Sequence, residues 1–398
     1  MLPFTRCLPD PDISMRDIAD FILDSKLGRK AICCTEIPRL PIFLRDLISI
    51  IYRLTISCHL PEFTDHGLRH LCSMVDRISL WTFKSASDDI TSLCDNFDDE
   101  GQQAAILLIA VLIHDIGMLS QRPEDLPKDN IKWPGKGNMD IPTWVRKTHV
   151  LRIRHLIKRL IINSIEEDYT DIYSSPLLNR AICVAEAHEK WPWENGFVNL
   201  IGQDIGLAAV LAVSDLLDED ASRCDSVTMI EHRQGTMLNY GHWIRHSLTT
   251  NRILITEGTV NITFVRPPDT DYQMAPVYAA LRNHYRLIKL YIEPLSIIGA
   301  GFLDVSFLEN SIPEIICPEL ENWYKIPGLT TQRALVYHLL NTFFPEAVID
   351  KRKVSSTFLT KIHDIDLEEI NLKLIYNIQG DFEIRSIYEQ ACYAIINE

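Results

Sequence analysis

The chain has 398 residues, of which 46% are hydrophobic and 23% are charged, so it is long enough to bury a large core as an ordinary globular protein. Acidic residues outnumber basic ones by 54 to 39, and the formal net charge of −15 argues against a surface that coats nucleic acid. The ten cysteines include no Cys-x-x-Cys pair, and we expect reduced thiols.

The N-terminal residues lack the continuous apolar segment of a signal peptide. The longest apolar run, residues 104–113, is too short to span a bilayer. We therefore expect a cytoplasmic protein without membrane contact.

Apolar residues recur with helical spacing from about residue 15 to residue 225. The run 104–113 is apolar throughout, which predicts a helix buried on all sides. Residues 122–142 are rich in Pro and Gly and predict a long loop of the kind that covers a binding site. The other helices are expected at residues 17–27, 42–58, 64–81, 143–162, 177–189 and 201–217, the third of them capped by Thr64-Asp65.

The pattern changes near residue 240. Residues 252–256 and 259–265 alternate in polarity around Glu257-Gly258, which predicts a β-hairpin, and a helix is expected near 277–292. The expected fold class is therefore mainly α, with a small α+β C-terminal extension. Its expected parts are an N-terminal helical segment (1–59), a helical core (60–225), a hairpin-and-helix extension (226–300) and a C-terminal region without assigned chemistry (301–398).

Polar residues interrupt the two most apolar helices. His114 and Asp115 close the run 104–113, and Asp215 lies within the apolar run 207–217. A buried imidazole or carboxylate needs a partner, and a metal ion is a common one. Taken singly, these residues have structural explanations: a hydrogen-bonded core histidine, a helix cap, a salt bridge. Further histidines occupy helical positions both upstream and downstream, and the joint pattern favours a metal site; these are His66, His70, His149 and His188.

The order His…His-Asp…His…His…Asp resembles the HD superfamily of metal-dependent phosphohydrolases. The branch that it resembles comprises HD domains found beside, or fused to, Hsp90-like ATPases in bacterial conflict systems. The resemblance implies that residues 60–225 form an HD-domain helical core. It is carried by Asp65-His66-Gly67-x-x-His70, Leu112-Ile-His114-Asp115-Ile-Gly117, Arg146-x-x-His149, His188 and Ser214-Asp215-Leu-Leu-Asp218.

The resemblance also implies roles for individual residues. His70, His114, Asp115 and Asp215 would hold one ion, and Asp115 would bridge to a second ion held by His149 and His188. Asp115 counts as catalytic for this reason, together with His66, which would protonate the leaving group. Candidate substrate-binding cations are Arg69, Arg146, Arg152 and Lys190.

The ligand types suit one or two divalent ions of Mn, Fe, Co, Ni, Zn or Mg, which activate water. The expected function is hydrolysis of a nucleotide (dNTP, NTP or cyclic nucleotide), in the setting of a bacterial antiphage system. One alternative is a nucleotide-sensing regulatory subunit that docks a partner ATPase, and another is a single-strand nuclease, which the acidic balance disfavours. Expected partners are the nucleotide substrate and, through the C-terminal region, another protein or a second copy of the chain.

Overall fold

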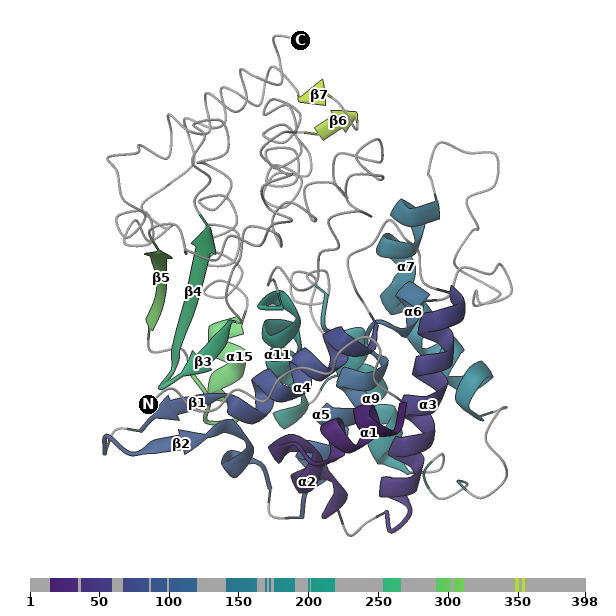
Figure 1. The fold of residues 1–398 in the computed structure, drawn as a ribbon, viewed down its shortest axis with the longest axis horizontal. Helices are drawn as coiled ribbons and strands as arrows, with labels where there is room; N and C mark the ends of the chain where they lie inside the picture. The colour runs from purple at the N-terminus through teal and green to yellow at the C-terminus, as the bar shows by residue number, and fades with distance from the viewer. Residues whose placement is uncertain are drawn as a thin grey trace. The chain divides into compact units, whose positions relative to one another are not determined.

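The architecture comes from a computed structural model, drawn in Figure 1. It describes residues 15–34, 37–58, 67–85, 87–98, 100–119, 141–162, 169, 172, 175–189, 200, 202–218, 253–265, 291–301, 304–310, 348–350 and 353–354. The chain divides into two compact units. The first comprises Met1–Asp218, Ile255–Gly258 and Leu290–Leu303, and the second comprises Glu219–Leu254, Thr259–Lys289 and Asp304–Glu398.

The first unit is mainly helical, which confirms the expected fold class for the core. Its described helices are α1(Met15–Leu23), α2(Lys26–Ile32), α3(Leu40–Cys58), α4(Leu68–Leu80), η1(Leu93–Asn96), α5(Gln102–Ile113), α6(Ile116–Leu119), α7(Ile141–Leu156), the π-helical turn η3(Ile157–Ile162), α9(Pro176–Glu186), α11(Gln203–Leu216) and α15(Ile292–Ser296). The predicted loop at 122–142 lies almost entirely outside the described residues, and α7 already begins at Ile141.

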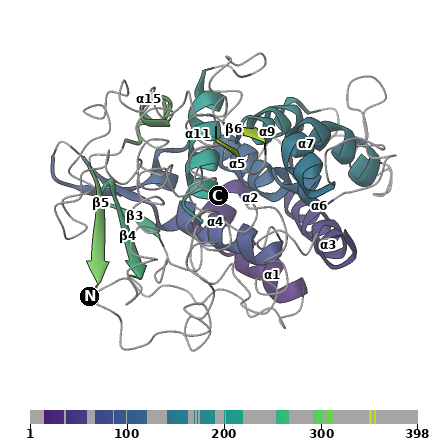
Figure 2. The same cartoon turned by 90° about the horizontal axis from the view of Figure 1, so that it is seen from above.

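Helix α5 is buried along its length, as predicted. Every residue from Ala104 to Ile113 is at most 2% exposed. Figures 1 and 2 show α5 among the helices that contact it, which include α2, α3, α4, α9 and α11. Among the described residues, Gln102–Leu119 is long and apolar enough to cross a membrane by length and composition, but 94% of it is buried inside the protein. Burying each large aliphatic side chain here contributes about 1.5–3 kcal/mol, so α5 accounts for much of the core.

The helix predicted at 17–27 is two helices in the structure. Ser25 ends the first and caps the second: its Oγ donates to the Ile22 carbonyl (2.6 Å) and accepts from the Gly28 amide (2.9 Å). A Cβ at Gly28 would lie 2.3 Å from that same carbonyl oxygen, so only glycine permits this approach. Apolar spacing alone did not reveal this break because it continues across the cap.

The helix predicted at 64–81 begins later than expected. Helix α4 starts at Leu68 and its N-cap is Gly67, which has no side-chain cap, so the expected cap at Thr64-Asp65 is wrong. After α4 the structure adds an unpredicted antiparallel pair, β1(Thr82–Lys84) and β2(Ile90–Ser92). Strands of three residues are too short to show the alternation by which strands are predicted.

The predicted hairpin is present as β3(Leu254–Thr256) and β4(Thr259–Val265), separated by Glu257-Gly258. The strand order is β3-β4-β5, and β5(Asp304–Asn310) pairs with β4 in parallel from Thr259↔Asp304 to Val265↔Asn310. A short antiparallel pair, β6(Val348–Asp350) and β7(Lys353–Val354), lies in the second unit. Most of the helix predicted near 277–292 lies outside the described residues. The four-segment organisation stays a prediction.

Candidate metal centre

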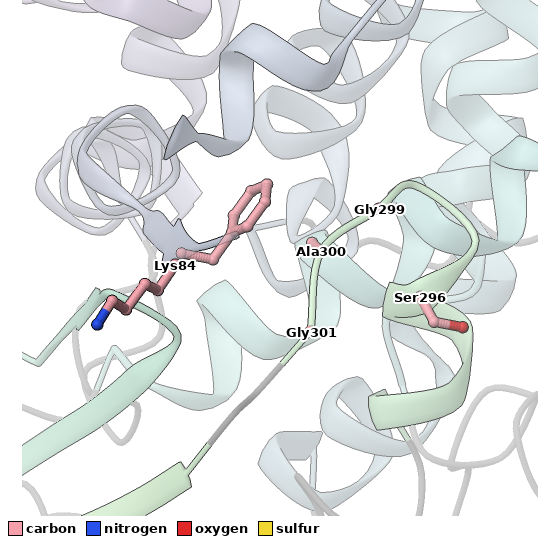
Figure 3. Close-up of a pocket in the computed structure, with 6 residues that line it drawn as sticks. Lys84, Ser296, Gly299, Ala300 and Gly301 are labelled. Atoms are coloured by element: carbon pink, nitrogen blue, oxygen red, sulfur yellow. The ribbon is translucent and has the colours of Figure 1, made fainter. Parts of the chain in front are cut away.

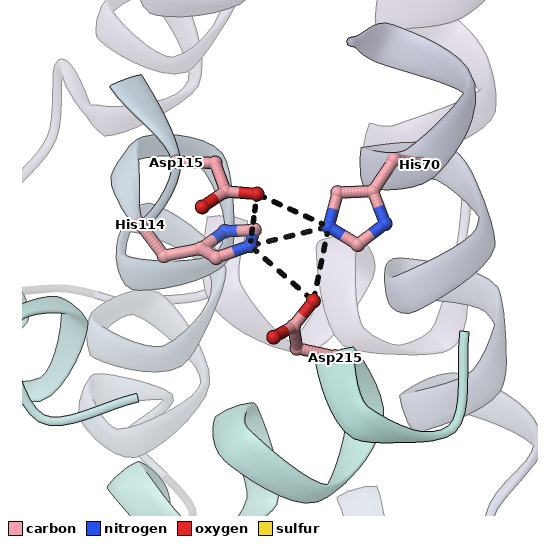
Figure 4. Close-up of side chains that lie close together, drawn as sticks. All are labelled: His70, His114, Asp115 and Asp215. Atoms are coloured by element: carbon pink, nitrogen blue, oxygen red, sulfur yellow. Dashed lines mark hydrogen bonds and ion pairs between the residues drawn. The ribbon is translucent and has the colours of Figure 1, made fainter. Parts of the chain in front are cut away.

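Four potential metal-binding side chains lie close together in the first unit (Figure 4). This first cluster consists of His70 on α4, His114 and Asp115 at the junction of α5 and α6, and Asp215 on α11. One ligand atom of each lies within 4.8 Å of all the others. The Nε2 atoms of His70 and His114 are 3.2 Å apart, and Asp215 Oδ1 is 3.4 Å from His70 Nε2. Three distant parts of the sequence thus direct nitrogen and oxygen donors at one point.

A second cluster adjoins the first and shares one residue with it. It consists of Asp115, His149 on α7 and His188, which follows the last turn of α9. The Nε2 atoms of His149 and His188 are 3.1 Å apart, and both residues are 3% exposed. All six histidine and aspartate residues predicted as metal ligands are therefore brought together; their role as ligands stays a proposal.

Asp115 divides its two carboxylate oxygens between the clusters. Oδ2 lies 3.3 Å from His114 Nε2 and 3.7 Å from His70 Nε2. Oδ1 lies 3.7 Å from the Nε2 atoms of both His149 and His188. The position follows from local structure, because α5 ends at His114 and a new helical turn starts with the Met118 amide donating to the Asp115 carbonyl. One carboxylate at this junction reaches both histidine pairs.

The hydrogen bonds of the four imidazoles fix their tautomers. His114, His149 and His188 each point Nδ1 at the backbone carbonyl three residues earlier, at 2.7–2.8 Å, and His70 points Nδ1 at Asp218 Oδ2, at 2.5 Å. Carbonyl and carboxylate oxygens only accept, so each Nδ1 carries a proton, and Nε2 of a neutral imidazole presents a lone pair. Two neutral imidazoles at these Nε2–Nε2 distances bring two lone pairs together, an arrangement that a cation between them stabilises.

Burial and neighbouring charges shift the pKa values of three of the clustered residues. At His114, burial opposes the charged imidazole, but the carboxylates of Asp115 and Asp215 outweigh it and raise the pKa to about 9. Burial would raise the pKa of the Asp215 carboxyl, yet His70 and His114 outweigh it and hold that pKa below its usual range. At His188, burial together with His114 and His149 lowers the pKa to about 4. The first cluster therefore attracts positive charge, while His188 is a neutral imidazole at physiological pH.

The donor set and its spacing suit a divalent cation. Imidazole nitrogen and carboxylate oxygen are ligands of the borderline divalent ions of the first transition series and of zinc. A tetrahedral ion about 2.1 Å from each donor holds neighbouring donors about 3.4 Å apart. The Nε2 atoms of the two histidine pairs are 3.1 and 3.2 Å apart, and the donor atoms of each cluster all lie within 4.8 Å of one another. The buried His and Asp side chains can therefore hold a divalent metal ion.

Arg152, predicted to bind substrate, is fully buried. It donates through Nη2 to the Gly117 carbonyl, and its guanidinium carbon lies 4.7 Å from the centroid of the Trp144 ring. These contacts join α7 to the segment that carries Asp115, the residue shared by the two clusters. This position gives no support to a substrate role for Arg152, which stays a prediction.

The other predicted substrate-binding residues are placed differently. Arg69 directly precedes His70 on α4 and Arg146 lies three residues before His149 on α7, and both are half-buried. His66, the predicted acid, and Lys190 lie outside the described residues.

Two further carboxylates stand next to the clusters and were not assigned a role from the sequence. Asp218 accepts the Nδ1 proton of His70, and Glu189 Oε1 lies 3.7 Å from His149 Nε2. The sequence does contain a pattern that points to Asp218. It lies three residues after Asp215, and this spacing puts both carboxylates near one face of a helix. Glu189 simply follows His188, and nothing in its surroundings in the sequence distinguishes it.

A separate cavity of about 270 Å³ lies in the first unit (Figure 3). It is lined by Phe83, Lys84, Ser296, Gly299, Ala300 and Gly301. The Lys84 ammonium at its edge is paired with Asp88 at 2.9 Å. No residue of either cluster lines this cavity, so it is not the candidate centre.

A mainly helical fold with His/Asp clusters at the ends of buried helices defines an HD-type domain, and it fits a metal-dependent hydrolase. The family model described as HD-CE matches residues 60–293, more than half of the chain. The chain belongs to the HD-CE family. No curated protein and no solved structure matches it.

Proposed function

We propose that the protein is a phosphohydrolase that cleaves a phosphoester or phosphoanhydride of a nucleotide with the help of two divalent ions. The observation that carries this proposal is the Asp115 carboxylate, whose two oxygens face two separate pairs of histidine Nε2 atoms. Paired ions about 3.5–4 Å apart are a recurring device for phosphate hydrolysis. When bound, such ions acidify water and neutralise charge on the phosphate oxygens.

The exposed edge of the clusters indicates where a substrate would approach. His70 is 0% exposed and His149 is 3% exposed, whereas the side chains of Asp215 and Glu189 are 29% and 41% exposed. The histidines bind from the protein interior, and the two carboxylates stand at the solvent side. A phosphate group would therefore reach the clusters from the side of Asp215 and Glu189.

The residues around the clusters take the remaining roles in this proposal. Glu189 Oε1 is placed to accept a proton from water entering beside His149. Arg69 and Arg146 lie on the helices that carry His70 and His149, and forked guanidinium donors suit phosphate oxygens. His66 is the proposed donor of a proton to the leaving oxygen, on the basis of its match to the HD motif alone.

We also propose the biological setting on the motif resemblance alone. HD domains that resemble this one stand beside Hsp90-like ATPases in bacterial conflict systems, so the proposed partner is such an ATPase and the proposed role is antiphage defence. Pull-down of an ATPase from cells under phage challenge, with an Asp115→Ala chain as comparison, tests this setting.

The activity is tested with the full chain, stripped with chelator and reloaded in turn with Mn²⁺, Co²⁺ and Mg²⁺. The substrate panel contains dNTPs, NTPs, cyclic mono- and dinucleotides, and single-stranded DNA. We expect release of phosphate or nucleoside monophosphate from at least one nucleotide, and loss of that activity in Asp115→Ala. The matched control is Asp95→Ala, which removes an exposed carboxylate paired with Lys26 at 2.8 Å and keeps activity.

Two results contradict the proposal. Bound metal without turnover of any nucleotide favours the regulatory alternative. Degradation of single-stranded DNA, with all mononucleotides left intact, favours the nuclease.

A further inference from the structure

Asp218 is a fully buried carboxylate that accepts three hydrogen bonds beside the first cluster. Its Oδ2 accepts from His70 Nδ1 at 2.5 Å, and its Oδ1 accepts from Ser73 Oγ at 2.5 Å and from Arg77 Nη2 at 3.0 Å. The buried guanidinium of Arg77 always carries a proton, so the carboxylate of Asp218 is the counter-charge that it needs. It is not itself in the metal cluster, since His70 stands between.

The three donors to Asp218 come from one face of α4. His70, Ser73 and Arg77 are spaced i, i+3 and i+7, so they lie in line along the helix. Arg77 also donates to the Ser214 carbonyl at 2.9 Å and to Ser73 Oγ at 3.3 Å. The network joins α4 to the end of α11, which carries Asp215.

Folding stability alone does not explain why Arg77 and Asp218 form a buried ion pair. The Arg77 and Asp218 side chains are both 0% exposed, and removing two charges from water costs several kcal/mol per ion, which their attraction does not reliably recover. Apolar residues of similar volume would stabilise such a contact as well or better. The arrangement is explained more directly by what it does to the imidazole of His70.

Among the four clustered histidines, His70 differs in its acceptor. His114, His149 and His188 donate Nδ1 to neutral backbone carbonyls, whereas His70 donates to a carboxylate. A carboxylate holds the ring orientation and tautomer more firmly and makes the opposite nitrogen a stronger ligand. The first cluster also offers four protein ligands, and the second offers three.

We propose that Asp218, held by Ser73 and Arg77, is the positioning residue for His70 and makes the first cluster the tighter of two cation sites. The inference rests on the proposed function in so far as His70 binds metal. It predicts that the two ions bind in order, first at the His70 side and then at the His149–His188 side.

The variant Asp218→Asn tests this with little change in shape. An amide cannot accept from all three donors: it either turns its NH₂ toward Ser73 and Arg77 or turns it toward His70 Nδ1. The full chain, freed of metal, is titrated with Co²⁺ and followed by calorimetry and visible absorption. The ¹⁵N chemical shifts of the His70 imidazole, recorded without metal, report its tautomer.

We expect two classes of Co²⁺ site in the parent chain. In Asp218→Asn the Co²⁺ affinity of the tighter site falls by about 10- to 100-fold, and the affinity of the weaker site is unchanged. The His70 resonances no longer show a single Nδ1–H tautomer. The matched control is Asp204→Asn, which disrupts another buried carboxylate, paired with Arg180 at 2.7 and 3.0 Å. It lowers stability but leaves both Co²⁺ affinities as they were.

The experiment separates failure of the proposed function from failure of the inference on Asp218. A parent chain that binds no Co²⁺ overturns the proposed function and, with it, the ordered binding of two ions. A parent chain with two sites whose affinities and His70 tautomer persist in Asp218→Asn overturns only the role of Asp218. If Asp218→Asn does not fold, Ser73→Ala removes one of the three donors; the tighter class must weaken by a smaller factor, and an unchanged affinity overturns the inference.

Discussion

The Nε2 atoms of His149 and His188 lie 3.1 Å apart, and each imidazole has already used its Nδ1 proton on a backbone carbonyl. Two lone pairs at that distance repel one another unless a cation joins them. Burial lowers the pKa of His188 to about 4, with help from His114 and His149, so a proton does not readily supply that charge. This pair is the strongest argument for the second of the two proposed ions.

Substitution of Asp115 and of Asp215, one at a time, tests which cluster each carboxylate serves. Asp115 faces both histidine pairs, whereas Asp215 Oδ1 lies within 4.0 Å of the Nε2 atoms of His70 and His114, the pair of the first cluster. We expect Asp115→Ala to lose metal from both clusters and Asp215→Ala to lose only the ion of the first. Metal content per chain, measured by mass spectrometry after dialysis, checks this. Equal loss in the two variants would contradict the division of the Asp115 oxygens.

The clustered residues were predictable because each is a polar group placed against an apolar run. His114 and Asp115 end α5, whose residues are otherwise apolar from Ala104 onward, and Asp215 lies near the end of α11. Such groups need a partner, and this requirement is visible in the sequence. The network around Asp218 was not predicted, because Arg77 and Asp218 are 141 residues apart and their pairing exists only in the folded chain.

Glu189→Gln tests the proton acceptor at the exposed edge. Its Oε1 lies 3.7 Å from His149 Nε2, yet its side chain is 41% exposed. Loss of a general base lowers kcat by about 10²- to 10⁴-fold while leaving the metal content unchanged. The matched control is Glu186→Gln, three residues earlier, whose carboxylate pairs with Arg154 at 2.9 Å and points to a separate contact. Loss of metal in Glu189→Gln would instead make this residue a ligand of the second ion.

Gly117→Ala tests the close packing between α6 and α7. A Cβ at Gly117 would lie 2.2 Å from the His149 carbonyl oxygen, so the two helices must move apart. Overpacking of this kind costs about 1–3 kcal/mol of unfolding free energy. We expect a lower Tm together with weaker metal binding at the second cluster, because His149 moves with α7.

The control for this substitution is Gly301→Ala, where a Cβ would meet nothing within 4 Å. It should leave Tm and metal content unchanged. A Gly117→Ala chain with the parent Tm would show that the α6–α7 contact is looser than the structure indicates.

The last prediction concerns the alkaline limit of stability. Cys94 is 1% exposed, and burial raises the pKa of its thiol from 9.0 to about 12, against an opposing effect of Lys26. In the unfolded chain the thiol ionises near its ordinary pKa, so above that pH the unfolded state loses a proton that the folded state keeps. The stabilisation is therefore complete below about pH 9 and is lost as the pH rises toward 12, with a loss of about 1–2 kcal/mol between pH 9 and 10.5.

Urea unfolding at these two pH values measures this loss. The free energy of unfolding should decline less in Cys94→Ala than in the parent chain, whereas Cys33→Ala, at an exposed position, should show the parent decline. An identical decline in Cys94→Ala would assign the alkaline loss to other groups.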